Sequence, residues 1–206
     1  MLSNESYITS GCIISDHEVR KNGTILFEDK ASGMPGFLTV CYQHFGFKYP
    51  KFHKMDNLAK LGWLAAELLL NEGELAGKYQ PADMGVVLAN KNSSLDTDLK
   101  YYETAKDIAS PALFVYTLPN IVIGEICIRH NFKGENAFFI AEHFDAGFIR
   151  QYVSNLINSD ILQACICGWV EVLGDSYKVA LFLIEKKGSI AFTNENINKI
   201  YQLENG

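Results

Sequence analysis

The sequence has little that would bind nucleic acid or insert into a membrane. Its formal net charge is −6 over 206 residues, and no basic patch is evident, so nucleic acid and anionic membranes are poor partners. No apolar stretch reaches the roughly 18 residues of a membrane-spanning helix. The N-terminus lacks a basic segment followed by an apolar core, which a signal peptide would have. The sequence therefore predicts a soluble, cytoplasmic protein, although a local basic patch could still bind an acidic carrier.

Linkers and metal-binding patterns are absent as well. No Pro/Ser/Gly-rich segment or charge run divides the chain, which is 48% apolar, so one domain over residues 1–206 is expected. The histidines are scattered, and Cys165 and Cys167 are separated by one residue only, so neither set predicts a metal site. No cofactor is expected, because no glycine-rich phosphate loop is present. The number of cysteines is odd and most lie in apolar runs, which favours reduced, buried thiols over disulfides. These cysteines are Cys12, Cys41, Cys127, Cys165 and Cys167.

What the chain does contain is an alternation of strand-like and helix-like segments, which predicts an α/β fold. The predicted strands are residues 7–15, 84–89, 138–141, 162–172 and 177–185. The predicted helices are residues 56–71, 120–130 and 145–156, with Gly73 ending the first and Gly124 giving the second a tight contact with a neighbouring element. We expect a five-stranded, mostly parallel sheet with an antiparallel edge strand, covered by three helices. Residues 16–54 are an insertion, predicted to hold a hairpin or short irregular elements, and the polar tail from residue 193 a short peripheral element.

Four segments carry motifs of one known family. They are YITSGCIIS at residues 7–15, residues 118–134 with Asn120, Gly124, Arg129 and Gly134, ACICGWVE at residues 164–171 and YKVALFLIE at residues 177–185. In this order they resemble the N-terminal half of the β-ketoacyl synthases, members of the thiolase-like superfamily. The resemblance implies a thiolase-like half as the fold and a role in bacterial gene clusters for fatty-acid, polyketide or aryl-polyene products.

The nucleophile of that family is missing. The segment FFIAEHFDAG at residues 138–147 has no cysteine, and the resemblance places the nucleophile's position near His143. Cys127 and Cys165 are predicted in the preceding helix and the following strand, so neither replaces it. The family's other two catalytic residues come from a second half that 206 residues have no room to contain. Because condensation needs a thiolate, the sequence predicts no catalytic residue and a subunit that acts through a partner synthase or an acyl carrier.

An alternative interpretation places catalytic residues at the same turn. Glu142, His143 and Asp145 place two carboxylates beside an imidazole, so an acyl-transfer or hydrolytic enzyme is chemically conceivable. A polar turn in which Asp145 caps the following helix explains the same residues without chemistry.

Two polar segments are candidates for binding a substrate or carrier. Ser93, Ser94 and Asp96 follow a predicted buried strand, at the edge where open α/β sheets bind ligands, although a solvated loop with Asx turns explains them too. Lys51 and Lys54 alternate with aromatic residues and could bind an acidic acyl carrier protein or its phosphopantetheine arm. A rim of lysines whose stems cover apolar surface explains them nearly as well.

The resemblance also predicts an interface. In that family two such halves pack together, so a free half would expose apolar helices and a sheet edge to water. We therefore expect a dimer, either with itself or with a complete β-ketoacyl synthase. The third predicted strand, residues 138–141, and the helix at residues 120–130 are the expected seam.

Overall fold

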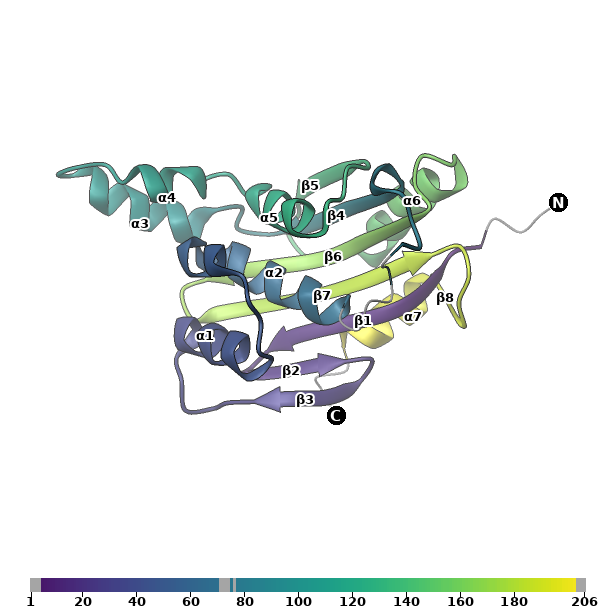
Figure 1. The fold of residues 1–206 in the computed structure, drawn as a ribbon, viewed down its shortest axis with the longest axis horizontal. Coiled ribbons are helices and arrows are strands. Elements are labelled where there is room, and N and C mark those ends of the chain that lie inside the picture. The colour runs from purple at the N-terminus through teal and green to yellow at the C-terminus, as the bar shows by residue number, and fades with distance from the viewer. Residues whose placement is uncertain (1–4, 71–74, 76, 203–206) are drawn as a thin grey trace.

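The computed structural model describes residues 5–70, 75 and 77–202, which form one twisted sheet with helices on both faces (Figure 1). The order along the sheet is β3-β2-β1-β7-β6-β4-β5, and β8 pairs with β1 beyond the end of β2. The strands are β1 Tyr7–Ser15, β2 Glu18–Lys21, β3 Thr24–Glu28, β4 Met84–Asn90, β5 Asn136–Ile140, β6 Ala164–Leu173, β7 Ser176–Glu185 and β8 Ile190–Ala191. All five predicted strands are present, and the α/β class is confirmed.

The directions of the strands refine the predicted sheet. Four of the predicted strands, β1, β4, β5 and β6, run the same way, because β4 is parallel to β5 and β6 while β7 is antiparallel to both β6 and β1. Strand β7 runs the other way because the two-residue turn Gly174–Asp175 joins it to β6, and a hairpin that short enforces antiparallel pairing. The antiparallel member of the predicted five therefore lies inside the sheet. The antiparallel edge is instead the β2–β3 hairpin.

That hairpin belongs to residues 16–54, which were predicted to hold a hairpin or irregular elements. The turn that joins β1 to β2 and the turn that joins β2 to β3 both have residues with positive φ, namely Asp16 and His17 in the first and Asn22 and Gly23 in the second. This backbone geometry matches the twist of a two-residue hairpin. The segment continues into α1 Met34–His44 and the short 3-10 helix η1 Pro50–Lys54. It extends the sheet rather than interrupting it.

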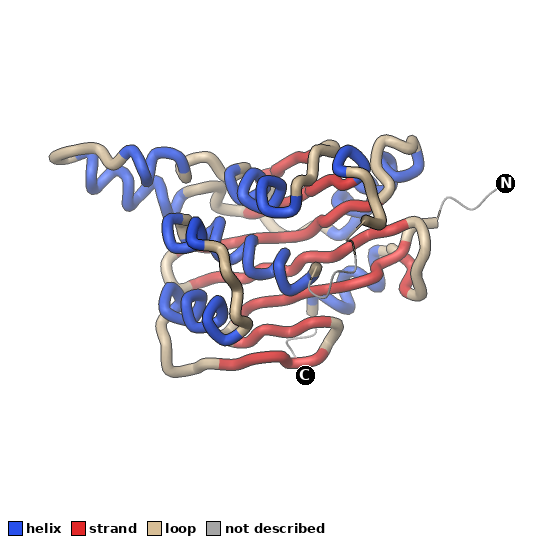
Figure 2. Tube along the Cα trace, viewed as in Figure 1, coloured by secondary structure: helices blue, strands red, loops and turns tan. Residues whose placement is uncertain are grey.

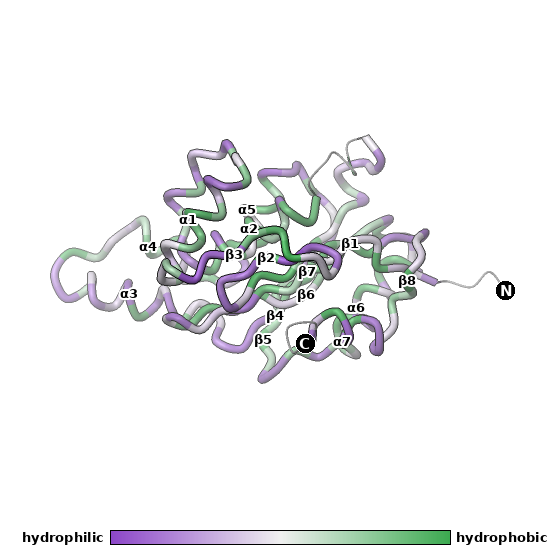
Figure 3. Tube along the Cα trace, turned by 90° about the horizontal axis from the view of Figure 1, so that it is seen from below, coloured by the Kyte–Doolittle hydropathy of each residue, from purple (hydrophilic) through white to green (hydrophobic). Residues whose placement is uncertain are grey.

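Helices cover both faces of the sheet, as the tube in Figure 2 and the edge-on view in Figure 3 show. Besides α1 and η1, the described chain has α2 Asn57–Leu69, α3 Leu95–Ala105, α4 Pro111–Val115, α5 Ile121–His130, α6 Ala146–Asn158, α7 Asn194–Tyr201 and the 3-10 helix η2 Pro81–Asp83. On one face of the sheet lie α1, α2 and α5, and on the other lie α6 and α7. Three helices were predicted, and the described chain has more because residues 16–54, the segment after β4 and the segment after β8 also form helices. Within the described residues no helix is both long and apolar enough to cross a membrane.

The C-terminal helix α7 is more than the peripheral element that was predicted. Its Ile197 is completely buried and belongs to the same apolar core as Ile149 of α6 and Phe182 of β7. The polar composition of the tail concealed this contact, because a single buried side chain per turn is enough to dock a short amphipathic helix. Helix α7 therefore covers one face of the sheet.

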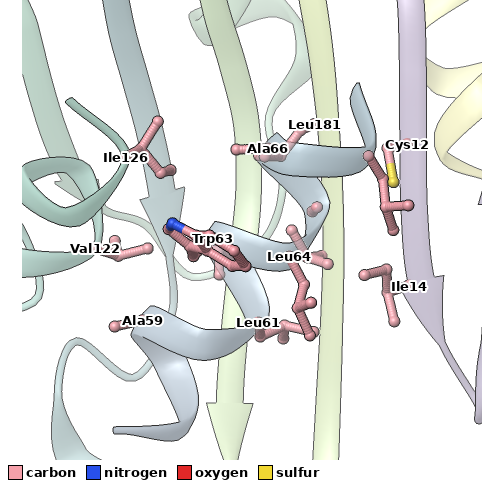
Figure 4. Packing of buried hydrophobic residues seen from close by; sticks show 14 of the residues in the cluster. Cys12, Ile14, Ala59, Leu61, Trp63, Leu64, Ala66, Val122, Ile126 and Leu181 are labelled. Atoms are coloured by element: carbon pink, nitrogen blue, oxygen red, sulfur yellow. The ribbon is translucent and has the colours of Figure 1, made fainter. Parts of the chain in front are cut away.

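The close contact between α2 and α5 comes from a different glycine than predicted. A Cβ at Gly62 would lie 2.4 Å from Val122 Cγ2, whereas a Cβ at Gly124 would have no neighbour within 4 Å. Trp63, next to Gly62, is fully buried and lies beside Val122 and Ile126 of α5 (Figure 4). Helices α2 and α5 therefore approach each other closely at Gly62 of α2. Gly73, predicted to end α2, lies outside the described residues.

Candidate functional site

The turn after β5 contains Glu142, His143 and Asp145, the residues that the sequence motifs single out as the expected place of a nucleophile. Ala141 N donates to Asn90 O (2.8 Å), and Asp145 Oδ1 accepts from Phe148 N (2.9 Å) at the start of α6. The predicted capping by Asp145 is confirmed. Glu142 and His143 are exposed, and within the described chain no hydrogen bond or ion pair joins His143 to either carboxylate. The turn therefore holds the three side chains without the contacts that would orient His143 as a base.

The inner side of this turn is filled by aromatic rings. Phe144 stacks on Tyr201 of α7, with ring centroids 4.3 Å apart, and its ring also lies 6.2 Å from Trp169 and 6.4 Å from Phe182. Lys178 Nζ also lies over the Tyr201 ring, 4.1 Å from its centroid. Helix α7 thus packs its last aromatic residue against the turn. Phe144 is therefore surrounded by aromatic rings on the inner side of the turn.

The five thiols are free, and Cys12, Cys41, Cys165 and Cys167 are buried while Cys127 is partly buried. The prediction of free, buried thiols is confirmed for these four, and Cys127 is free but only partly buried. Burial raises the pKa of Cys12 and of Cys41 to about 12 and the pKa of Cys127 to about 11. It raises the pKa of Cys165 and of Cys167 further still. Since the thiolate is the reactive form, none of these thiols is activated.

We expect the native thiols to react at least about 100-fold more slowly with a disulfide reagent at pH 8 than the thiols of the unfolded chain, because burial suppresses the thiolate and blocks access. Cys127 should react first, since it has the lowest raised pKa and is the least buried of the five. The measurement is thiol titration in buffer and in denaturant. One thiol that reacts at once in the native protein would contradict the assignment.

The polar residues after β4 are engaged with the protein itself. Ser93 N donates to Asn90 Oδ1 (3.0 Å), and Ser94 Oγ donates to Thr117 O (2.8 Å). Asp96 Oδ1 accepts from Gly174 N (3.0 Å), while its Oδ2 accepts from Lys100 Nζ (2.6 Å). These bonds tie the start of α3 to neighbouring loops. The geometry matches the predicted alternative of a loop with local side-chain turns, and binding of a substrate by Ser93, Ser94 and Asp96 stays a prediction.

The two candidate lysines differ in their surroundings. Lys51 Nζ lies 2.7 Å from Glu125 Oε2, and Glu125 is buried in α5, where its Oε1 accepts from Tyr116 OH (3.1 Å). Lys51 therefore neutralises a buried carboxylate and fastens η1 to α5. Lys54, at the end of the same 3-10 helix, is exposed and makes no ion pair in the described chain. Lys54 thus remains available to a carrier, whereas Lys51 is already paired.

A buried ionic network between α2 and α5 was not predicted. Glu67 is 7% exposed, and its carboxylate accepts from Arg129 Nε (3.1 Å) and Nη2 (3.2 Å) and lies 2.8 Å from His130 Nε2. Burial alone would raise the pKa of Glu67, but the hydrogen bonds from His130 and Arg129 outweigh it, so that pKa lies below its usual value. The available sequence signal was an acidic residue inside the apolar run LGWLAAELLL. Among the described residues, no three His, Cys, Asp or Glu side chains form a metal-binding group.

Comparison with solved structures identifies the fold. The chain is similar to the ishigamide ketosynthase/chain length factor, with a TM-score of 0.63, 16% identity and coverage of 88% of this chain and 62% of that one. It is also similar to a chain from the complex of a ketosynthase with its chain length factor from Xenorhabdus doucetiae (TM-score 0.61, 9% identity, 98% of this chain and 92% of that one). The chain has a ketosynthase-like fold. This likeness confirms the thiolase-like class that the sequence motifs predicted.

A third solved structure is similar to the chain to about the same degree. It is the complex of a type II polyketide synthase acyl carrier protein with its ketosynthase bound to the hexaketide (TM-score 0.60, 15% identity, 88% of this chain and 62% of that one). The present chain thus spans less than two thirds of the length of the first and third of these ketosynthase structures. No protein-family model matches the sequence, and no curated protein matches it either. At these identities the likeness describes the fold.

Proposed function

We propose that this chain is a non-catalytic ketosynthase-like subunit of fatty-acid, polyketide or aryl-polyene biosynthesis, which acts as one domain through a partner ketosynthase or an acyl carrier protein. The observation that carries the proposal is the turn after β5, which contains no cysteine, although the resemblance to the synthases places their nucleophile near His143. The chain's five thiols lie in other elements and have raised pKa values. A condensation through an acyl thioester needs a thiolate at that turn.

The structural neighbours support a partnership. Two of them are described as a ketosynthase with a chain length factor, and a third as an acyl carrier protein in complex with its ketosynthase. A chain with this fold and no activated thiol fits the role of the companion subunit better than that of the condensing one. In this proposal the companion shapes the length of the product or the assembly of the complex.

The predicted seam lies at an exposed edge of the sheet. Strand β5 pairs with β4 on one side, and no described strand pairs with its other side. Its last residue, Ile140, is 55% exposed, and Ile128 of the neighbouring α5 is exposed too. An unpaired strand edge with apolar side chains is a ready template for a second chain. We propose that a ketosynthase or a second copy of this chain covers β5 and α5.

The helices α3 and α4 extend this apolar surface. They project from the side of the sheet as an arm (Figure 1), and half of the exposed large apolar side chains of the described chain lie on it or directly after it. These side chains are Leu95, Leu99, Tyr102, Ile108, Phe114, Val115 and Leu118. So many exposed apolar side chains on one short segment are typical of a protein interface. The arm is therefore part of the proposed contact.

A substitution at the seam tests the partnership. Ile140→Lys should weaken the dimer or the complex with a co-expressed ketosynthase by about 10-fold to 100-fold, because it places a charge in the apolar contact. Light scattering and sedimentation at micromolar concentration give the dissociation constant. The matched control is Ile25→Lys on β3, at the opposite edge of the sheet, where the isoleucine is 46% exposed. A wild-type monomer that binds no ketosynthase, or equal effects of the two variants, would contradict the proposed seam.

The absence of catalysis has its own test. With malonyl and acyl carrier substrates, the purified chain should form no covalent adduct and no product, and His143→Ala should change nothing. Mass spectrometry of the intact protein and of the carrier measures both. If the wild type cleaved the thioester and the His143→Ala variant did not, this would support the acyl-transfer or hydrolytic alternative and contradict the non-catalytic role.

A further inference from the structure

The face of the sheet that carries α7 has a hollow of about 400 Å³ beside β1. Its walls come from segments far apart in the sequence. Ile8 and Thr9 belong to β1, Asn22 to the β2–β3 turn, Ser189 to the loop between β7 and β8, Ile190 to β8 and Ile200 to α7. The volume lies within the roughly 300–1,000 Å³ that is typical of small-molecule sites. It is separate from the turn at His143 and from the β5 edge.

The pairing of β1 explains why a hollow forms here. Along one side, β8 pairs with Tyr7 and Ile8, while β2 pairs with β1 only from Cys12 to Ser15. The residues between, 9–11, lie in the gap that the two neighbouring strands leave. Gly11 keeps the floor of this gap low, since a Cβ there would already lie 3.5 Å from Ile200 Cγ2. The hollow is therefore a consequence of the strand register.

The described walls of the hollow are mainly apolar and carry no charge. Three isoleucines, Ile8, Ile190 and Ile200, provide the apolar part, and no Asp, Glu, Lys or Arg is among the described residues that line it. Burying alkyl groups against such walls is favourable, at roughly 0.8 kcal/mol for each methylene removed from water. A charged ligand would lose hydration without gaining an opposite charge. The lining therefore selects a neutral ligand with a hydrocarbon part.

One polar side chain at the hollow has a fixed orientation. Asn22 Oδ1 accepts from Gly11 N (2.8 Å), and Asn22 N donates to Gly11 O (2.8 Å), so the oxygen end of the amide is held toward β1. Its Nδ2 is then the end left for another partner, and within the described residues it donates to no protein group. The hydroxyl of Ser189 also lines the hollow. Both groups can donate to a carbonyl oxygen.

We propose that this hollow binds a neutral, medium-chain aliphatic ligand with a carbonyl group. The hydrocarbon chain lies against Ile8, Ile190 and Ile200, and the carbonyl oxygen accepts from Asn22 Nδ2. The site is independent of the proposed partnership, because neither β5 nor the α3–α4 arm contributes to it.

The test compares two probes of equal length by NMR with the whole chain. Octanamide should bind with a dissociation constant of about 1 mM or lower, and octanoate at least about 5-fold more weakly, because none of the described lining residues is a cation that could pair with its carboxylate. The amide signals of Gly11, Gly23 and Ser189 should shift most. Octanoate binding as tightly as octanamide, no binding of octanamide, or shifts confined to other regions would overturn the proposal.

Variants locate the site and its polar contact. Ile190→Trp should fill the hollow and weaken octanamide binding at least about 10-fold, whereas Ile161→Trp, at an isoleucine of similar exposure in the turn before β6, should leave it unchanged. Asn22→Asp keeps an acceptor for Gly11 N and tolerates the positive φ, but it removes the two N–H donors. It should weaken octanamide binding about 5-fold. Unchanged affinity in Ile190→Trp or in Asn22→Asp would overturn the proposal, and a failed test would leave the seam experiments unaffected.

Discussion

Replacing Gly168 by alanine should destabilise the protein by about 3 kcal/mol or more. A Cβ at this position would lie 1.9 Å from Ala180 O in the adjacent strand β7, and the backbone φ of +149° disfavours any residue with a side chain. The backbone oxygen cannot move away without breaking the β6–β7 pairing, in which Gly168 faces Leu181. Urea denaturation followed by circular dichroism measures the loss, and failure to fold at 37 °C agrees with it.

A second glycine supplies the control. Gly124→Ala adds the same methyl group to α5, where a Cβ would meet nothing within 4 Å. Alanine favours a helix over glycine, so this variant should be more stable than the wild type by about 0.4–1 kcal/mol. If both glycine variants lost similar stability, the close contact at Gly168 would not be the cause.

Glu67→Gln should cost about 2–3 kcal/mol at pH 7. The carboxylate is 7% exposed and is held by Arg129 and His130, and removing its charge leaves the guanidinium of Arg129 without its counter-charge next to the core. The measurement is the free energy of unfolding from denaturant titration. Glu103→Gln is the matched control, because Glu103 pairs with Lys106 on the surface of α3 and should change stability by less than about 0.5 kcal/mol.

The effect of Glu67 also depends on pH. Because the folded pKa of Glu67 lies below its ordinary value, the carboxylate stabilises the fold above the unfolded pKa of about 4.3. That contribution is lost as the pH falls through the folded pKa. The difference in stability between the wild type and Glu67→Gln should therefore shrink below about pH 4.5. A difference that stays constant from pH 7 to pH 3 would show that the charge of Glu67 is not what stabilises the α2–α5 contact.

The elements of the fold could be predicted from sequence where periodicity was strong. The apolar runs that became β1, β4, β6 and β7 are buried on both faces, and such runs stand out in a sequence. The β2–β3 hairpin was less visible, because β3 is an exposed edge strand with little alternation. Strand order and the inner place of β7 depend on tertiary contacts, which periodicity does not encode.

The candidate site, too, could be predicted from the sequence only in part. A missing cysteine can be read directly from the sequence, so the lack of a thiol at the turn after β5 was predictable. The roles of polar side chains were not, because their partners are distant in the chain. The carboxylate of Asp96 accepts a hydrogen bond from Gly174 N, Lys51 forms an ion pair with Glu125, and Glu67 forms an ion pair with Arg129. A polar residue near a strand end cannot be assigned to a ligand or to the protein until those partners are known.

The pairing of β1 with β7 and β8 has a consequence for folding. Thr9 Oγ1 donates to Leu183 O across a separation of 174 residues, so β1, an inner strand of the sheet, can pair with β7 only after nearly everything between them has been synthesised. Contacts of such long range are slow to form, and until then β1 exposes an apolar edge. Biosynthesis of this chain should therefore depend on chaperones that shield the nascent N-terminal strand, and deletion of residues 176–202 should leave an aggregating polypeptide rather than a smaller folded one.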